Sequence, residues 1–334
     1  GGQPYVAQQA VGALIGISLF VLWNERRYLC SVMRKALGKS SELDDSREPL
    51  SYRTALLGIL LGVAALSLLA WQLGISLRVI WLFLLIYFII SIGITRLRAE
   101  LGAPVHDLFW VGPESYMFNA VGSAAFSPRD IGVMRLFYFM SRAYGGHPMP
   151  VQMEAYKMGD RLGLSQRKLT WVMLLAAVVG VAAAFIIMTA TLHHLGGGTT
   201  RVLAAPSIGS EQFEYLKYQL ETPEPPSPER LAATFGGAIF AIVLLGVRLR
   251  MVNFPFHPLG FTLGSTWSMT YLWVSIFVGW LIKVMLLRYG GQRTYLRALP
   301  IFFGIILGDC LWGVIWLVTG VLLNRATFSV WWPN

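Results

Sequence analysis

The chain has 334 residues, of which 55% are hydrophobic and only 13% are charged, and its mean hydropathy is +0.58. Soluble domains carry about 25% charged residues, so this composition excludes an ordinary soluble globular protein and predicts an integral membrane protein. The net charge of +10 would favour a nucleic-acid partner in a soluble protein. Here the basic residues lie between apolar runs, and the positive-inside rule accounts for that placement. We therefore predict the lipid bilayer, and not nucleic acid, as a partner.

Three apolar runs in the first third of the chain predict membrane crossings, because each approaches the about 20 residues that a helix needs to span a bilayer. They cover residues 6–23, 54–71 and 79–94. Residues 24–53 carry seven Lys/Arg against five Asp/Glu and are predicted to form a cytoplasmic loop.

Residues 103–146 have a different pattern, in which Pro, Gly and charged residues interrupt the apolar runs. Irregular backbone survives at membrane depth only where it is buried in protein or lines a cavity, and transporters build their sites from such broken helices. We therefore predict a hairpin of discontinuous helices. The alternative is an amphipathic segment over residues 131–144 that lies on the membrane surface.

The second half predicts further crossings separated by polar segments. Residues 146–168 are basic and are predicted to be a cytoplasmic loop, whereas residues 193–230 contain five Glu and are predicted to be external, with a short helix over 210–220. The predicted crossings are 170–192, 231–246, 267–287 and 300–323, with a re-entrant element at 254–265 and a basic loop at 288–297. The fold class is thus all-α, a single transmembrane domain over 1–334 with about seven transmembrane helices and one or two re-entrant hairpins.

Three carboxylates are candidates for proton coupling, since a buried carboxylate has its pKa raised and can exchange a proton near neutral pH. Asp309 lies in the middle of the run 300–323, Glu114 lies in the broken segment, and Glu100 follows the third crossing. A charged group at membrane depth usually faces a bundle interior or a water-filled path. The alternatives are that Asp309 only bonds a neighbouring helix, and that Arg96 and Arg98 hold Glu100 in a salt bridge.

A weak internal repeat supplies candidate substrate-pathway residues. Arg-Leu-Arg followed by Pro-x-His-x-Leu occurs twice after an apolar helix, and matching breaks in two parts of a chain are typical of transport sites. The arginines could bind a substrate carboxylate or serve as positive-inside anchors. The histidines could relay protons or cap helices. Nearby aromatic residues could line a solute pocket or only pack against other side chains. These candidates are Arg96, Arg98, His106, Arg248, Arg250, His257, Trp267, Tyr271 and Trp312. The spacing of His, Cys and acidic residues predicts no metal site and no cofactor.

Three segments in the second half resemble the oligopeptide transporter superfamily, which includes the yellow-stripe-like transporters. The segment EAYKMGDRLGLSQRK, with Lys157, Gly159, Gly163 and Arg167, is similar to a cytosolic loop motif of that family. FPFHPLGF is similar to the Pro-rich stretch before a late helix, and GIILGDCLW to the closing Gly-Asp motif. Departures such as Met158 and Cys310 leave the substrate open.

The resemblance implies a proton-coupled secondary transporter of small peptides or metal chelates, here as the C-terminal half of a longer protein in an uncharacterised prokaryotic branch. We expect it in the inner (plasma) membrane, with the solute and protons as partners and a second copy of the chain as a further candidate. The alternative is a non-transporting structural or accessory subunit of a membrane complex. An enzyme is not predicted, because the chain has no H-E-x-x-H, G-x-S-x-G or paired intramembrane aspartates.

Overall fold

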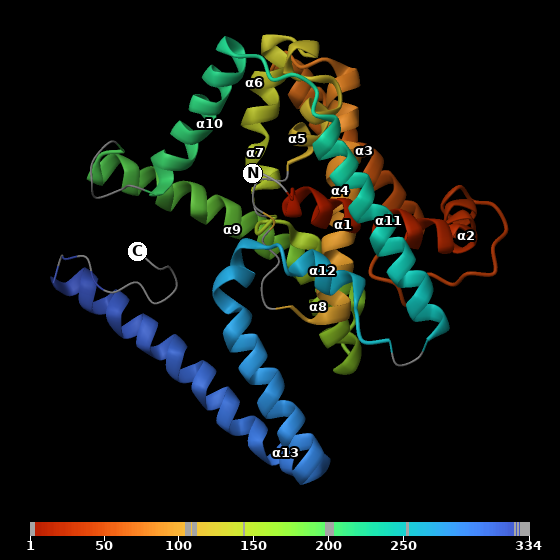
Figure 1. Ribbon diagram of the computed structural model, residues 1–334, viewed down its shortest axis with the longest axis vertical. Helices are drawn as coiled ribbons and strands as arrows, with labels where there is room; N and C mark the ends of the chain where they lie inside the picture. The colour runs from red at the N-terminus through yellow and green to blue at the C-terminus, as the bar shows by residue number, and fades with distance from the viewer. Residues whose placement is uncertain are drawn as a thin grey trace. The chain divides into compact units, whose positions relative to one another are not determined.

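The computed structural model describes residues 4–103, 108, 112–142, 144–197, 204–251, 254–323, 325 and 327, and every regular element in these ranges is a helix (Figure 1). The predicted all-α class is therefore confirmed. Six helices are long and apolar enough to cross a membrane. They are α1 (Val6–Asn24), α3 (Tyr52–Gln72), α4 (Leu77–Leu101), α9 (Gln166–Leu195), α11 (Pro228–Arg250) and most of α13 (Trp267–Leu323).

Shorter helices fill the segments between these six. They are α2 (Arg26–Ala36), α5 (Pro113–Val121), the 3-10 turn η1 (Ser123–Ala125), α6 (Pro128–Leu136), α7 (Tyr138–Ser141), α8 (Pro148–Arg161), α10 (Ala204–Glu221) and α12 (Pro258–Leu263). Four of them begin with proline, whose fixed φ suits the first helical position and whose missing N–H is not needed there. The predicted loops 24–53 and 146–168 thus contain the helices α2 and α8, and α10 is longer than the helix predicted at 210–220.

The tightest helix contact joins α1 to α11 through glycines. A Cβ added at Gly12 would lie 1.9 Å from the carbonyl oxygen of Thr234, and one at Gly237 would lie 2.0 Å from the carbonyl oxygen of Gln9. Gly16 approaches Ala238 in the same way. Small residues four positions apart let two helix backbones touch, so dispersion and weak Cα–H···O contacts form between them. These contacts matter in a membrane because lipid provides no hydrophobic driving force for helix association. The GxxxG spacing of α1 therefore serves an internal contact.

The opposite side of α1 packs against α4, so α1 lies between two long helices (Figure 1). A Cβ at Gly93 of α4 would lie 2.7 Å from the Ser18 hydroxyl oxygen. Val11, Ala13, Leu14 and Ile17 of α1 are fully buried in a core cluster that also includes residues of α4, α11 and α12. A second cluster joins α3 and α4 to α5 and α6. Most buried side chains of the broken segment 103–146 belong to these two cores, which disfavours a surface-lying amphipathic segment.

The described residues divide into two compact units, residues 1–270 and 271–334. The second unit contains most of α13, which Figure 1 draws in blue as two rods that meet at a sharp bend. The bend is at Gly291, whose φ of 66° lies in the left-handed region that glycine adopts without steric cost. The predicted basic loop over 288–297 is wrong, because the helix re-forms directly after this one residue.

We predict that Gly12→Ala destabilises the protein by about 1–3 kcal/mol, since the new methyl group would overlap the backbone of α11. The matched control is Gly58→Ala in α3, where an added Cβ would have no described heavy atom within 4 Å apart from the nearby backbone of its own helix. Alanine favours a helix over glycine by about 1 kcal/mol, so this control should be neutral or stabilising. Thermal unfolding in one detergent compares the two variants, and equal melting temperatures would contradict the packing assignment.

Candidate functional site

A polar cavity of about 560 Å³ lies in the first unit, where the N-terminal ends of α1 and α11 meet α5, the α6–α7 pair and α10. The hydroxyl of Tyr5 donates a hydrogen bond to Glu229 over 2.8 Å, which joins the start of α1 to the start of α11 at this end. The cavity lining is mostly polar or aromatic: Pro4, Tyr5, Val6, Ala7, Gln8, Glu114, Ser115, Phe118, Asn119, Arg135, Tyr138, Gln212, Tyr215, Gln219, Glu224 and Arg230. A mixture of apolar walls and a few convergent polar groups is typical of small-molecule sites.

Local helix signals bring Glu114 and Arg135 to this cavity. Pro113 starts α5, so Glu114 stands in its first turn, where the helix dipole favours a carboxylate. Ser127 and Asp130 form a capping box that starts α6, and Arg135 follows in its last turn. Asp130 also accepts a 2.7 Å hydrogen bond from the backbone N–H of Ser76, which ties α6 to the start of α4.

Glu114 is the most unusual group of the cavity. Its side chain is 2% exposed, and its Oε1 lies 3.8 Å from Nη1 of Arg135, which is too long for a hydrogen bond. Its Oε2 is buried and has no hydrogen-bond partner among the described residues. Burial raises the pKa of Glu114, and the nearby Arg135 charge acts in the opposite direction. Glu114 lies outside the six candidate spans and combines the burial and the incomplete pairing that let a carboxylate hold a proton.

The guanidinium of Arg135 is occupied by neutral groups of α10. Nε donates to Gln219 over 3.1 Å and Nη1 to Gln212 over 3.4 Å, and the ring of Tyr215 lies 5.4 Å from the guanidinium carbon. Both glutamines are buried. Amide and aromatic contacts satisfy the donors of Arg135 without cancelling its charge, so the positive charge remains available to Glu114 or to an anionic group in the cavity.

Backbone contacts close the other wall of the cavity. Ser123 donates its N–H to the carbonyl oxygen of Glu224 over 2.9 Å, and its hydroxyl accepts from the N–H of Glu224 over 2.8 Å. Arg230 donates to the Asn119 side chain over 3.4 Å, and Ser227 donates to the Asn119 carbonyl. The end of α5 is thereby fixed to the loop that precedes α11, and a second arginine faces the cavity.

Asp130 shows by contrast what full hydrogen bonding does to a buried carboxylate in the same segment. Although burial acts to raise its pKa, hydrogen bonds from Ser76 and Ser127 lower the pKa below its ordinary value. The hydrogen bonds of Asp130 therefore favour its ionised form, whereas burial disfavours the ionised form of Glu114. Carboxylates with opposite environments are the usual arrangement where one is structural and the other exchanges protons. Within the described ranges, no group of three or more His, Cys, Asp or Glu could hold a metal ion.

The predicted pathway residues at the end of α4 form a separate ionic cluster. Arg96 pairs with Glu100, and Nε2 of His257 lies 3.8 Å from the same carboxylate. Arg98 donates through Nε to Glu154 of α8 over 2.5 Å. The Arg96 pair agrees with the salt-bridge alternative for Glu100, whereas the ion pair of Arg98 is with Glu154. His257 also accepts from the N–H of Leu259 through its Nδ1, which caps α12.

The remaining predicted site residues lie in other parts of the chain. Arg248 and Arg250 are exposed at the end of α11, and His106 lies outside the described residues. Trp267 begins α13. Tyr271, Asp309 and Trp312 belong to the second unit, where all three are exposed. The coupling role of Asp309 stays a prediction.

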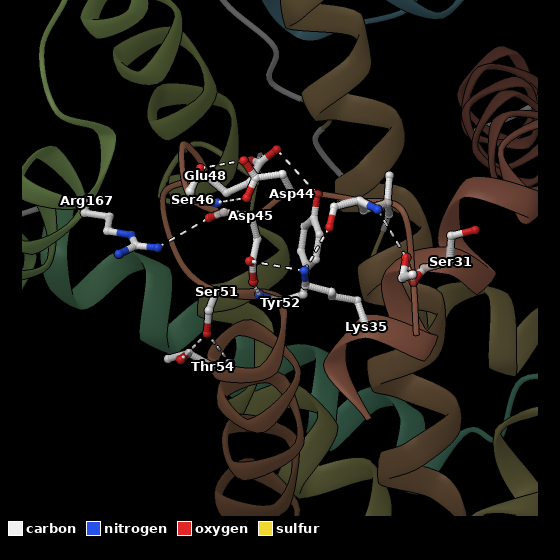
Figure 2. Close-up of polar contacts among 12 residues, drawn as sticks. Ser31, Lys35, Asp44, Asp45, Ser46, Glu48, Ser51, Tyr52, Thr54 and Arg167 are labelled. Carbon is white, nitrogen blue, oxygen red and sulfur yellow. Dashed lines mark hydrogen bonds and ion pairs between the residues drawn. The ribbon is translucent and has the colours of Figure 1, made fainter. Parts of the chain in front are cut away.

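The loop-motif residues have local structural roles. Gly163 takes a φ of 67° in the turn from α8 to α9, and a Cβ at Gly159 would lie 2.8 Å from the Leu169 side chain. Lys157 pairs with Asp160 at the surface. Arg167 donates to the carbonyl oxygen of Asp45 over 3.3 Å and so binds the segment between α2 and α3 (Figure 2).

Sequence reasoning missed most of the cavity. It selected Glu114 but not Arg135, Arg230, Asn119 or the two glutamines of α10. Arg135 alone carried a usable signal, because it is an isolated charge within the apolar stretch VMRLFYF. Glutamine and asparagine in a polar external segment look like solvated loop residues, so no sequence pattern marks them as cavity lining.

The described residues form an all-helical protein with six helices that are long and apolar enough to cross a membrane, and with a partly buried polar cavity. A model of a family of unknown function, DUF6785, matches residues 1–332, and the chain belongs to this family. No curated protein and no solved structure matches the chain.

We predict opposite pH dependences of stability for the two buried carboxylates. The raised pKa of Glu114 means that its stabilising contribution is complete below its ordinary value of 4.5 and is lost as the pH rises through its folded-state pKa. Glu114→Gln should therefore remove a decline in melting temperature at rising pH. The lowered pKa of Asp130 means that its stabilising contribution is lost as the pH falls, so Asp130→Asn should remove a decline in melting temperature at falling pH. Parallel slopes for wild type and Glu114→Gln between acid and neutral pH would contradict the assignment.

We predict that Glu114 and Arg135 are energetically coupled despite their 3.8 Å separation. Arg135→Gln should cost about 3 kcal/mol at neutral pH, since it leaves a buried carboxylate without a counter-charge. Adding Glu114→Gln should recover at least about 1 kcal/mol of this loss. Chemical unfolding of the two single variants and the double variant measures the coupling, and strictly additive effects would show that no pair exists.

Proposed function

We propose that the protein is a proton-coupled secondary transporter in which the polar cavity binds the solute and Glu114 binds the proton. The observation that carries the proposal is the buried Glu114 carboxylate with one unpartnered oxygen, which faces Arg135 in a cavity of solute size. A purely structural carboxylate would have fully hydrogen-bonded oxygens instead, as Asp130 does with Ser76 and Ser127.

Coupling follows from a competition for Arg135. When Glu114 is ionised, it attracts the guanidinium across the cavity; when it is protonated, this attraction disappears and Arg135 can pair with an anionic group of the solute. Proton and solute would then favour the same state, which is the requirement for symport. Gln212, Gln219 and Tyr215 of α10 would reorient with Arg135, so α10 would be the element that moves.

In the proposed membrane arrangement, residues 103–146 form a broken-helix hairpin within a bundle of about seven crossings. The two rods of α13 on either side of Gly291 would supply two crossings, which brings the six candidate spans to seven. The capping box of Ser127 and Asp130 satisfies backbone N–H groups at the start of α6, which suits irregular backbone that is buried in protein. By the positive-inside rule, residues 24–53 and 146–168 would lie in the cytoplasm and 193–230 outside a prokaryotic inner membrane.

The resemblance to oligopeptide transporters suggests peptides or metal chelates as solutes and Asp309 as a further proton site. A non-transporting accessory subunit is the second candidate, and a specific observation favours it. The apolar windows of α9 and α13 have no buried residues, although both helices are long enough to span. Such surfaces fit lipid, a second copy of the chain or the helices of a larger assembly. We do not propose an enzymatic activity.

We predict that proteoliposomes containing the protein take up peptides or metal chelates when a proton gradient is imposed, and that Glu114→Gln abolishes gradient-driven uptake. Asp309→Asn tests the second carboxylate beside it. Glu221→Gln is the matched control, because this carboxylate is exposed on α10 and pairs only with Lys217 over 3.9 Å among the described residues; it should transport as the wild type does.

Each outcome separates the candidates. Uptake that survives in Glu114→Gln but is lost in Asp309→Asn would move the proton site to α13. Uptake that no variant changes would remove proton coupling from both carboxylates. A folded wild type that takes up none of the solutes would favour the accessory subunit.

A further inference from the structure

The helix α2 carries an uncovered amphipathic face directly after the first candidate span. α1 ends at Asn24, and α2 begins at Arg26, so one residue separates them. Trp23 is 70% exposed at this junction, and the Arg26 guanidinium lies over its ring at 4.7 Å. Exposed tryptophan at the end of a span is typical of the level of the lipid headgroups. α2 therefore starts at the height of the membrane surface.

Two faces of α2 are already occupied. Ala36 is 5% exposed on the side where α2 packs against α3. On another side, the segment after α2 folds back onto Ser31 and Lys35, as Figure 2 shows. The Lys35 ammonium donates to the Leu43 carbonyl over 2.9 Å and lies 4.0 Å from Asp45.

The remaining face combines an apolar stripe with a basic edge. Leu29, Met33 and Leu37 stand four residues apart and are 41%, 47% and 63% exposed. Arg27 and Arg34, seven residues apart, lie beside this stripe on the helix and are also exposed. In the described part of the chain, neither arginine has an ion pair. The neighbouring acids are engaged elsewhere, since Asp45 accepts from the Tyr52 N–H and Asp44 from Ser46.

We propose that α2 is an interfacial anchor, with Leu29, Met33 and Leu37 inserted among lipid acyl chains and Arg27 and Arg34 bound to anionic lipid headgroups. An apolar stripe flanked by cations fits the boundary between headgroups and chains, where both parts of the face are satisfied at once. A protein partner would need an acidic rim around an apolar groove at the same height, whereas the bilayer that α1 enters already supplies both. The inference depends on the membrane character of the chain and not on transport.

Cys30 provides a probe on the same face, because it lies on the helix between the stripe and the basic edge. A nitroxide is attached to Cys30 in the full chain with Cys310→Ser, and the protein is placed in nanodiscs. One set contains phosphatidylcholine only, and the other also contains phosphatidylglycerol. The accessibility of the label to oxygen and to a water-soluble nickel chelate reports its depth.

We predict that phosphatidylglycerol shifts the label from a nickel-accessible to an oxygen-accessible position. Each of Arg27→Gln and Arg34→Gln should lower the ratio of bound to released α2 about fivefold, as expected for one cation at an anionic surface. Lys39→Gln is the matched control, since it removes the same charge outside the helix and should leave the ratio unchanged. Arg27→Lys should keep the lipid response.

Three results from the label on Cys30 would overturn the proposal. One is a label that stays equally accessible to nickel in both lipid mixtures. Another is a label that is shielded from both oxygen and nickel in phosphatidylcholine alone, which would indicate a protein contact. The last is a shift produced in phosphatidylcholine discs by inorganic phosphate, which would indicate a soluble anion site. If Lys39→Gln and Arg34→Gln had equal effects, the lipid response would depend only on net charge. That result would contradict the assignment of lipid binding to this face of α2.

Discussion

The contact between α1 and α11 is the constraint on which the first unit depends. Gly12 and Gly237 bring the two backbones to a distance that leaves no room for a Cβ, and Gly93 lets α4 close on the other side of α1. A long apolar helix surrounded by lipid gains little from burial alone, so close backbone packing has to fix its position. With α1 held between two helices, the Tyr5–Glu229 hydrogen bond sets the starts of α1 and α11 side by side. The polar cavity is built on that end.

The broken segment then determines the chemistry of the cavity. Its helices are short because proline starts α5 and α6 and because Gly122 and Ser127 lie between them. Each new helix start offers unpaired N–H groups, and the two buried carboxylates use them differently. Asp130 completes a capping box and a bond to α4, whereas Glu114 keeps one oxygen unpartnered opposite Arg135. Two similar helix starts thus place one fully bonded carboxylate, Asp130, and one incompletely paired carboxylate, Glu114, in the same segment.

The long helices differ in how much of their surface is buried against the rest of the protein. α1 and α4 are buried over a large part of their apolar windows, while α9 and α13 are bare in theirs. Bare helices suit the lipid-facing side of a transporter, and they equally suit contact with further helices of an assembly. The proposed interfacial face of α2 is uncovered as well. A bilayer would provide acyl chains for its apolar stripe and anionic headgroups for its arginines.

The sequence by itself determined the membrane character, the all-α class and the approximate course of the long helices, because twenty-residue apolar runs permit few other structures. It also identified Glu114, since a carboxylate in an apolar, proline-broken stretch is unusual in any fold. It did not show that Gly291 bends α13 without a loop, as basic residues on both sides resembled a polar connection. Only the tertiary structure decided which polar groups meet. Arg135 comes within 3.8 Å of Glu114. Gln212 and Gln219 contact Arg135 from 77 and 84 residues further along the chain, through packing that no local pattern encodes.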